Sequence, residues 1–305
     1  MNCSLSLIIP AYKAELTLDR CIRSIVSQSF QDWEICLIDD GSPDRCPEIC
    51  DEWAAKDERI RVAHQKNGGL SAARNRGIGM ARGLYITFVD SDDELAPETL
   101  QVLMKQMSEH PEYDILEYPV IENYRHPQGL EQRHIWEEKT YTDFTDYWLQ
   151  SAGFEHCWAC NKIFKRHHVF DKVAFATGCY YEDVKLMGEI ASLCPVIHTT
   201  SAGLYLYYYN GGGISKDYDG TKLTQLLENQ LHIVNLLHID LSSRGWSRLT
   251  MRLLNIQIDV YKLTGRIMLQ GITFHINHTL GLPSLIKSML AKTLGIRRTC
   301  EMWNR

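Results

Sequence analysis

The ten residues YITFVDSDDE, positions 85–94, join an apolar run to four carboxylates within five positions. Carboxylates this close raise one another's pKa unless water or a cation separates them. Two interpretations are open. The acids belong to a solvated loop after a buried strand, or they form a divalent-metal site at the carboxyl end of a central strand, where open α/β sheets bind their ligands.

The composition is that of an ordinary globular protein, with 45% apolar and 23% charged residues. Its 305 residues suffice for one large domain or two unequal ones. The net charge of −6 is unevenly distributed, because residues 243–305 carry ten Lys or Arg against two acids, or +8, which leaves −14 for residues 1–242. We therefore expect the two parts to face different partners, and we expect no nucleic acid among them.

The N-terminus predicts a cytoplasmic protein. Residues 1–10 have no basic flank and only a short apolar run, so they fit neither a signal peptide nor a membrane anchor. The ten cysteines lack the spacing of a disulfide framework and are expected to be free thiols. For Cys157 and Cys160, ordinary packing is favoured over a zinc or redox site, because zinc sites usually show a second such pair.

Strand and helix patterns alternate through the first hundred residues. Strands are expected at 5–10, 33–38, 61–63 and 85–89, and helices are expected to begin near Thr17, Pro47 and Ser71. Thr17 is expected to cap the first of these helices. This alternation implies right-handed crossovers and a mostly parallel sheet, so the loops after the strands open at one edge.

Two acidic loops and one glycine turn should meet at that edge. Asp39-Asp40 follow the second strand, about fifty residues before Asp90-Ser91-Asp92. The turn at Gly68-Gly69 precedes the third helix, where free N–H groups and Arg74 can receive phosphate. The combination is typical of a nucleotide site with a metal ion bridging a diphosphate.

Later segments are less regular. We expect a strand at 114–118 and a hairpin or excursion at 121–136. Asn161-Lys162 either contacts the acceptor half of the protein or places a lysine at the surface, with the surface favoured. A strand at 205–209 should run into a glycine-rich loop whose nearest cation is Lys216.

Four motifs then occur in a fixed order: Pro10-Ala11-Tyr12, Asp39-Asp40-Gly41-Ser42, NGGLSAARN at 67–75 and VDSDD at 89–93. Together they resemble glycosyltransferase family 2 of the GT-A fold, closely over residues 4–105 and more loosely to residue 215. The resemblance implies an α/β GT-A domain at 1–217, with a nucleotide-sugar half at 1–110 and an acceptor half at 111–217. A basic helical region at 218–305 follows it.

The resemblance also implies a nucleotide-diphosphate sugar as donor, most often a UDP-sugar. Pro10, Ala11 and Tyr12 fall where the family packs the uracil, and Asp40 falls where a carboxylate accepts the uracil imide N–H. Asp39 would support the loop or the ribose, or else cap the following helix.

The donor site would further include Gly69, Arg74 and Ser91. Asp90-Ser91-Asp92 matches the family's DXD signature, in which Asp92 would coordinate Mn²⁺ or Mg²⁺ and Asp90 would contact the ribose or a metal-bound water. Hard divalent cations bind one or two carboxylates plus substrate phosphates, and they neutralise charge on a departing diphosphate. Asp93 is assigned to a supporting role or to capping a helix expected at Pro97.

Glu182-Asp183 opens a helical pattern and is the candidate for acid–base chemistry. An inverting transfer needs a base for the acceptor hydroxyl, and the family places such a pair in the acceptor site, which assigns Asp183 as the base and Glu182 to positioning. The alternative is that both acids only complement the helix dipole.

Beyond residue 219 the pattern is helical and basic. A helix opened by Pro283 has one apolar side flanked by Lys287 and Lys292, followed by Arg297-Arg298. It is too short to span a bilayer. It fits the anionic face of a membrane, or equally a helix packed on the body or in a dimer.

The sequence thus predicts a cytoplasmic, metal-dependent, inverting hexosyltransferase at the inner face of the membrane, acting on a glycan or lipid-linked oligosaccharide in the synthesis of a surface polysaccharide. A sugar-nucleotide nucleotidyltransferase is one alternative, but residues 10–14 read PAYKA instead of a Gly-rich basic loop. A non-catalytic nucleotide-sugar or glycan-binding protein is another, and it would not depend on Asp183.

Overall fold

The computed structural model describes residues 3–193, 195–209, 219–237, 243–274 and 281–303. Contacts divide the chain into two compact units. The first comprises Met1–Thr142, Trp158–Gly178 and Leu193–Gly211, and the second comprises Asp143–Cys157, Cys179–Ser192 and Gly212–Arg305. The functional division expected at residue 217 stays a prediction, because these units are defined by contacts alone.

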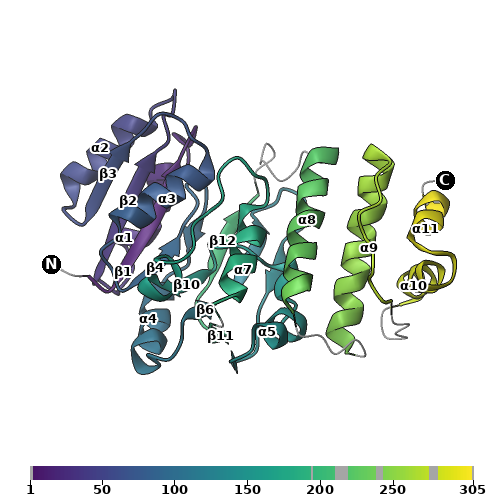
Figure 1. Cartoon of the computed structure of the whole chain (residues 1–305). Coiled ribbons are helices and arrows are strands. Elements are labelled where there is room, and N and C mark those ends of the chain that lie inside the picture. The colour runs from purple at the N-terminus through teal and green to yellow at the C-terminus, as the bar shows by residue number, and fades with distance from the viewer. Residues whose placement is uncertain (1–2, 194, 210–218, 238–242, 275–280, 304–305) are drawn as a thin grey trace. The chain divides into compact units, whose positions relative to one another are not determined.

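The first unit begins with alternating strands and helices, as predicted (Figure 1). These are β1 (Leu5–Ala11), α1 (Leu18–Val26), β2 (Trp33–Asp39), α2 (Cys46–Lys56), β3 (Ile60–His64), α3 (Leu70–Met80) and β4 (Tyr85–Phe88). Every residue of β1 and β2 is buried, which explains why their sequences are nearly continuous apolar runs. The shorter β3 lies at the edge of the sheet.

The main sheet has the order β3-β2-β1-β4-β10-β6-β11-β9. Its second half contains β6 (Ile115–Glu117), β9 (Lys139–Tyr141), β10 (Lys162–Lys165) and β11 (Ile197–Thr199). Only β10 and β9 run antiparallel to their neighbours. The α/β class with a mostly parallel sheet is therefore confirmed, although nothing in the sequence indicated the two reversed strands.

A smaller sheet lies beside the carboxylate loop. It has the order β5-β12-β7-β8, formed by β5 (Glu94–Leu95), β12 (Tyr205–Tyr208), β7 (Val120–Tyr124) and β8 (Gln132–His134). The β7–β8 pair is antiparallel and confirms the predicted hairpin. Because β5 begins directly after Asp93, its pairing with β12 brings residues near position 205 to that loop. Helices α4 (Thr99–Glu109) and α6 (Arg166–Val169) also belong to the first unit.

The second unit is helical. It contains α5 (Phe144–Gln150), a 3-10 turn at Gly153–Glu155, α7 (Glu182–Ala191), α8 (Gly220–Leu236), α9 (Arg244–Thr264), α10 (Leu282–Leu294) and α11 (Ile296–Trp303). Helix α8 packs against both α7 and α9 (Figure 1). Within the described ranges, no helix combines the length and apolar character needed to cross a bilayer. Every described cysteine is a free thiol, Cys157 and Cys160 included.

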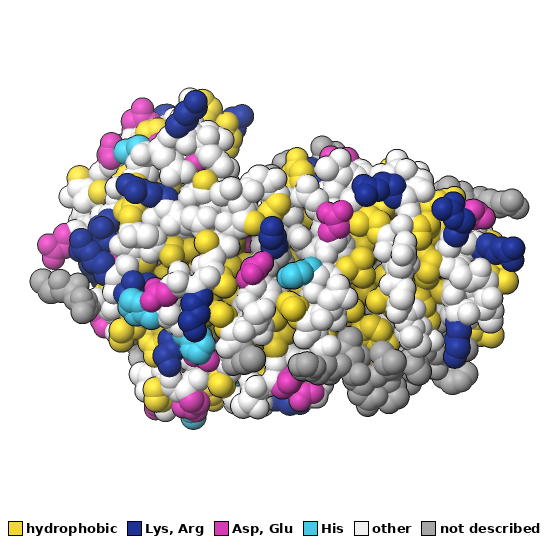
Figure 2. Space-filling model, viewed as in Figure 1, with side chains coloured by type: hydrophobic (Ala, Val, Ile, Leu, Met, Phe, Trp, Pro, Cys, Tyr) yellow, Lys and Arg dark blue, Asp and Glu magenta, His cyan; other side chains and the backbone are white. Residues whose placement is uncertain are grey.

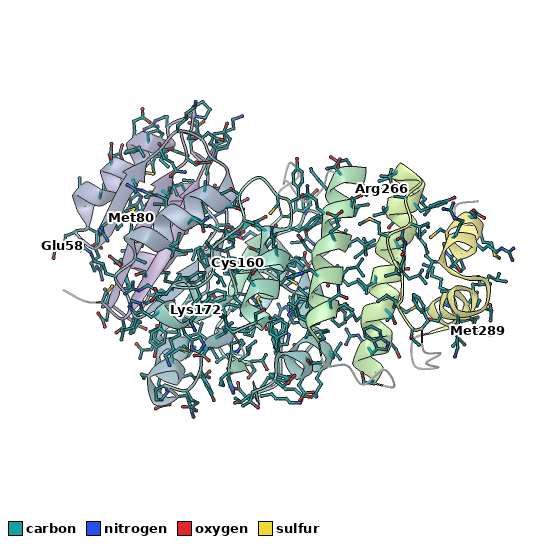
Figure 3. All side chains as sticks on the ribbon, in the orientation of Figure 1. Glu58, Met80, Cys160, Lys172, Arg266 and Met289 are labelled. Carbon is teal, nitrogen blue, oxygen red and sulfur yellow. The ribbon has the colours of Figure 1, made fainter. Side chains whose placement is uncertain are left out.

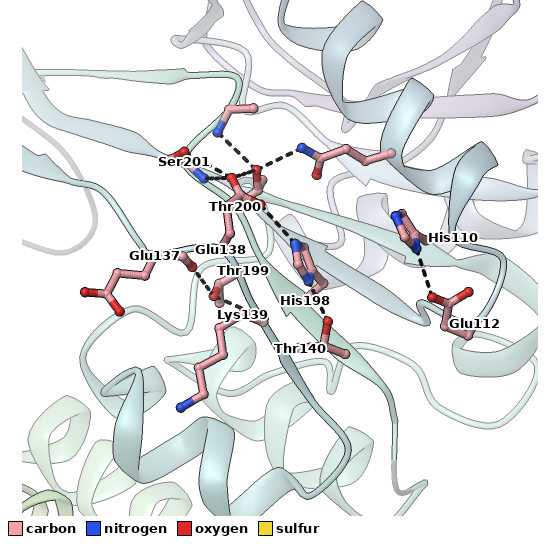
Figure 4. A network of polar contacts seen from close by, with 12 residues as sticks. His110, Glu112, Glu137, Glu138, Lys139, Thr140, His198, Thr199, Thr200 and Ser201 are labelled. Atoms are coloured by element: carbon pink, nitrogen blue, oxygen red, sulfur yellow. Dashed lines mark hydrogen bonds and ion pairs between the residues drawn. The ribbon is translucent and has the colours of Figure 1, made fainter.

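A carboxylate holds the last strand pair of the main sheet together (Figure 4). Glu138, which precedes β9, accepts hydrogen bonds from the Thr200 hydroxyl at 2.7 Å and the Ser201 backbone N–H at 2.8 Å. His198 Nε2 lies 3.1 Å from the same carboxylate. Partial burial raises the pKa of Glu138, but these hydrogen bonds outweigh it and lower the pKa to about 2.

A buried ion pair lies at the centre of the second half of the sheet. Lys162 of β10 and Glu117 of β6 are both fully buried, with Lys162 Nζ 3.1 Å from Glu117 Oε1. The ammonium group also donates to the Trp158 carbonyl at 2.9 Å and to the Asn161 side chain at 3.1 Å. The expectation of a surface lysine at this position is therefore wrong.

Two further local expectations are wrong. The Thr17 hydroxyl does not cap α1, because it donates to the Ala14 carbonyl instead. Of the two roles expected for Asp93, the helix cap is wrong, since Asp93 accepts hydrogen bonds from β12 and α4 begins only at Thr99; the supporting role remains. The loop expected to carry Lys216 lies outside the described residues.

Replacing Lys162 by Met is expected to lower the free energy of unfolding by about 3–5 kcal/mol, because the Glu117 carboxylate stays buried without its cation. The double variant Lys162→Met/Glu117→Leu should recover most of this loss, because no charge remains in the core. Urea denaturation measures both, with the exposed Lys105→Met as control. A double variant as unstable as the single one would contradict this interpretation of the pair.

Candidate active site

Residues predicted to bind a nucleotide meet at the carboxyl ends of β1, β2 and β4. Ala11 is the register partner of Asp39, and the Asp40 N–H donates to the Ala11 carbonyl at 2.9 Å. The Val89 N–H donates to the Ile8 carbonyl at 3.0 Å, which brings the start of the Asp90 loop beside β1. The structure thus confirms that segments about fifty residues apart share one edge. Their roles toward a ligand stay predictions.

Asp40 and the glycine turn form one unit at this edge. The buried Asp40 carboxylate accepts hydrogen bonds from the backbone N–H groups of Gly68 at 2.9 Å and Gly69 at 2.8 Å, and from the Gln65 amide at 2.7 Å. Gly69 has φ +84°, a conformation that disfavours any side chain. The turn therefore fixes the Asp40 carboxylate, which is expected to accept a hydrogen bond from the base of the nucleotide.

The neighbouring Asp39 supports the loop, as one of its predicted roles required. Its Oδ1 accepts from the Ser42 N–H at 2.9 Å, and its Oδ2 lies 2.9 Å from His64 Nδ1. His64 Nε2 in turn lies 3.1 Å from Asp51. The hydrogen bond to Asp39 is the largest influence on His64 and raises its pKa. Next to them, the Tyr12 ring is exposed after the buried Pro10 and Ala11.

Arg74 contacts a carboxylate. It is almost completely buried, and its guanidinium Nη2 lies 3.0 Å from Asp90 Oδ1. The guanidinium carbon lies 5.8 Å from the centre of the Phe88 ring and 5.1 Å from that of Phe175. Asn75 fixes Phe175 by donating to its carbonyl at 2.8 Å and accepting from its N–H at 2.9 Å. Arg74 therefore orients Asp90, while its predicted contact with phosphate stays a prediction.

Asp93 ties the carboxylate loop to β12, which the sequence did not indicate. The Tyr205 hydroxyl donates to Asp93 Oδ2 at 2.8 Å and accepts from the Asp90 N–H at 3.0 Å, and the Tyr208 N–H donates to Asp93 Oδ1 at 2.8 Å. Burial, with the charges of Asp90 and Asp92, raises the pKa of Asp93 well above its usual value. The tyrosine run at 205–209 was the only signal that could have pointed to this contact.

Arg20 of α1 is a second residue of this site that the sequence did not indicate. Its Nη2 donates to the Asp92 carbonyl at 2.6 Å, and its Nε lies 2.7 Å from Glu94 Oε1. The guanidinium stacks on the Tyr208 ring at 3.7 Å from the ring centre. The main chain of the predicted DXD motif is thus held from two sides, by Arg20 and by Tyr205.

The second candidate region is the start of α7. The helix begins at Glu182, and Asp183 follows in its first turn. Tyr181 precedes them with φ +55°, an uncommon conformation for a bulky residue. Asp183 belongs to the second unit and the nucleotide-site residues belong to the first. Its role as a base stays a prediction.

Comparison with known proteins identifies the family. The family model described as Glycosyl transferase family 2 matches residues 6–169. The glycosyltransferase GlyG of Streptococcus pneumoniae is 31% identical over 229 residues, which cover 70% of this chain and 73% of GlyG. The uncharacterized glycosyltransferase EpsJ of Bacillus subtilis is 48% identical over 111 residues, which cover 36% of this chain and only 32% of EpsJ.

Solved structures share the fold at low sequence identity. TarS of S. aureus, crystallised with UDP-GlcNAc, gives a TM-score of 0.67 at 20% identity, covering 98% of this chain and 83% of that structure. The mannosyltransferase PcManGT of Pyrobaculum calidifontis, in complex with GDP-Man and Mn²⁺, gives a TM-score of 0.60 at 13% identity, covering 100% and 84%. Because the family model covers more than half of the chain and GlyG is matched over more than two thirds of its length, the chain belongs to glycosyl transferase family 2.

Proposed function

We propose that this family 2 protein transfers a sugar from a nucleotide-diphosphate sugar, in the first place a UDP-sugar, to a hydroxyl group of a glycan or lipid-linked oligosaccharide. The observation that carries the proposal is the strand-edge arrangement of Asp40 on the Gly68-Gly69 turn beside the Asp90–Asp92 loop. In the proposed complex, the Asp40 carboxylate accepts a hydrogen bond from the imide N–H of the base, and Tyr12 stacks on the base. Ser91 and Gly69 line the path of the diphosphate.

A divalent cation, Mn²⁺ or Mg²⁺, fits the residues at the end of β4. Asp90 and Asp92 offer hard oxygen donors, and among the described residues no group of three His, Cys, Asp or Glu side chains could hold a metal ion. The remaining ligands would be phosphate oxygens and water, as hard cations prefer. When bound, the cation neutralises charge on the departing diphosphate. Arg74 orients Asp90 for this role, and Asp92 is the principal protein ligand.

Asp183 is proposed as the general base. It accepts the proton of the acceptor hydroxyl while that oxygen bonds to the anomeric carbon of the donor sugar. The bond from this carbon to the diphosphate oxygen breaks on the opposite face, so the configuration inverts and UDP leaves with the bonding electrons. Glu182 is assigned to holding the acceptor.

In the presence of Mn²⁺, UDP at about 100 times its dissociation constant should stabilise the protein by about 2.7 kcal/mol relative to the ligand-free protein. This stabilisation should exceed that by UDP alone or by Mn²⁺ alone. Asp92→Ala should remove the Mn²⁺-dependent part and lower UDP release from the donor by about 100-fold or more. Thermal unfolding and UDP release measure the two effects, with the exposed Asp259→Ala as control. An unchanged metal response in Asp92→Ala would contradict the assignment.

Asp183→Asn should lower UDP release by about 10²- to 10⁴-fold, the usual contribution of a general base, while stabilisation by UDP and Mn²⁺ persists. Glu189→Gln, on an exposed position of the same helix, is the matched control and should retain full turnover. Wild-type turnover in Asp183→Asn would instead favour another base. A wild-type chain that binds UDP and Mn²⁺ without turnover would favour a non-catalytic binding protein.

We also propose that α10 and α11 contact the anionic inner face of the cytoplasmic membrane. Helix α10 packs inward through small residues, since Ala291 is buried and the buried Ser288 hydroxyl donates to Met251 Sδ of α9 at 2.9 Å. Several of its large apolar residues are exposed, with Leu282 69%, Ile286 42% and Met289 45% exposed, and Figure 3 shows Met289 on this helix.

Basic residues also lie on α10 and α11. Lys292, Arg297 and Arg298 are all exposed, and Figure 2 shows basic and hydrophobic side chains side by side over the C-terminal helices. An apolar strip with flanking cations complements the interface of an anionic bilayer. This charge pattern favours a membrane over a second copy of the chain as the occupant.

The protein should cosediment with vesicles containing phosphatidylglycerol and much less with phosphatidylcholine vesicles. Changing Lys292, Arg297 and Arg298 to Gln should weaken binding by about 100-fold, at about 1 kcal/mol for each cation, and Ile286→Ser/Met289→Ser should weaken it too. Lys105→Gln, which removes an exposed lysine on α4 in the first unit, serves as the control. An apolar variant that changes the oligomeric state but not vesicle binding would assign the face to a dimer.

A further inference from the structure

The turn that precedes α7 has an unusual backbone. Gly178 has φ +70° and Tyr181 has φ +55°, so a bulky residue occupies a conformation that suits glycine. Such strain persists only where surrounding contacts impose it, and it is concentrated at functional sites. If this segment served only to start a helix, glycine at position 181 would meet the need without strain.

Side chains of α8 impose this conformation. Gln225 Oε1 accepts a hydrogen bond from the Tyr180 N–H at 2.8 Å. The Asn229 amide donates to the carbonyls of Tyr180 at 3.5 Å and Tyr181 at 3.3 Å. The Tyr181 carbonyl also accepts from the Val184 N–H at 3.1 Å in the first turn of α7. The C-terminal region thus determines where the chain enters the helix that carries Asp183.

The Tyr180 ring is held at the surface by this turn. It is 41% exposed, whereas Tyr205, which holds the carboxylate loop, is fully buried. Lys222 of α8 lies with Nζ 5.1 Å from the centre of the Tyr180 ring. Tyr180 thus offers an exposed apolar plane three positions before Asp183. Lys222 beside it offers a hydrogen-bond donor.

We infer that Tyr180 is part of the subsite for the acceptor saccharide and that Gln225 and Asn229 are positioning residues for it. A pyranose ring has one face lined by C–H bonds, which packs on an aromatic ring, while its edge of hydroxyl groups needs polar partners. Tyr180 supplies the plane and Lys222 a donor to the hydroxyl groups. The inference rests on the proposed function, in which Asp183 deprotonates the acceptor hydroxyl.

The test measures UDP release by the full-length chain with the UDP-sugar that it turns over best. The acceptor probes are p-nitrophenyl β-hexosides and p-nitrophenyl β-N-acetylhexosaminides. Tyr180→Ala should raise the KM for the stimulating glycoside by about 10-fold or more, with a smaller change in kcat. Tyr180→Phe and Tyr180→Trp should keep this KM within about threefold, because the ring and not the hydroxyl group makes the contact.

Asn229→Ala should instead lower kcat by about 10-fold with a smaller change in KM, because the turn loses its fixed geometry. Tyr261→Ala, an aromatic truncation on α9, is the control and should keep the wild-type KM. Thermal unfolding with UDP and Mn²⁺ verifies that each variant is folded and binds the nucleotide.

Three results would overturn the inference alone: a wild-type KM in Tyr180→Ala, a loss in Tyr180→Phe as large as in Tyr180→Ala, or a wild-type chain that turns over the donor but is stimulated by no glycoside. A wild-type chain that does not turn over any UDP-sugar would overturn the proposed function itself.

Discussion

Repulsion among the carboxylates that follow β4 is the constraint on which the site depends. Asp90, Asp92 and Asp93 stand within four consecutive residues, and such proximity raises the pKa of each acid unless a neighbour compensates the charge. The structure compensates them differently. Arg74 forms an ion pair with Asp90, whereas Asp93 is buried and accepts hydrogen bonds from the Tyr205 hydroxyl and the Tyr208 N–H of β12. Burial, together with the charges of Asp90 and Asp92, raises the pKa of Asp93 well above its usual value.

The same contacts fix the geometry of the loop before any ligand binds. Tyr205 holds the N–H of Asp90, and Arg20 holds the carbonyl of Asp92. The Arg74 guanidinium is itself fixed between two aromatic rings, one of which is anchored by Asn75. A site whose main chain is already ordered loses less entropy on binding and holds reacting groups closer to productive positions. The buried polar contacts around position 90 thus orient Asp90 and Asp92.

The sequence predicted the parts of this arrangement that depend on local patterns. Strands up to Phe88 follow from short apolar runs and helices from a period of 3.6 residues, and parallel topology brings Asp39, Asp40 and Asp90 to one edge. Arg20 and Tyr205 could not be found in this way, because they lie 72 and 115 residues from their partners in the loop. Only the pairing of β5 with β12 brings Tyr205 there, and no local rule specifies that pairing.

Local rules also gave wrong answers where tertiary contacts prevailed. Asp93 precedes a helix and so suggested a cap, but β12 offered it stronger partners. Lys162 suggested a surface residue, because lysine is rarely buried unless paired, and the sequence does not show Glu117 as its partner.

The C-terminal helices also show what a local sequence pattern does not specify. Apolar residues at helical spacing predict a stripe, yet the period does not say whether a neighbour covers it. In α8 the stripe is buried, with Leu227 and Ile233 fully enclosed, and the polar Gln225 and Asn229 reach the turn before α7. In α10 the small residues Ser288 and Ala291 are buried, whereas Leu282, Ile286, Met289 and Leu294 are exposed. The exposed part of these side chains contributes nothing to the stability of the fold, and it is this part that the proposed membrane contact would bury.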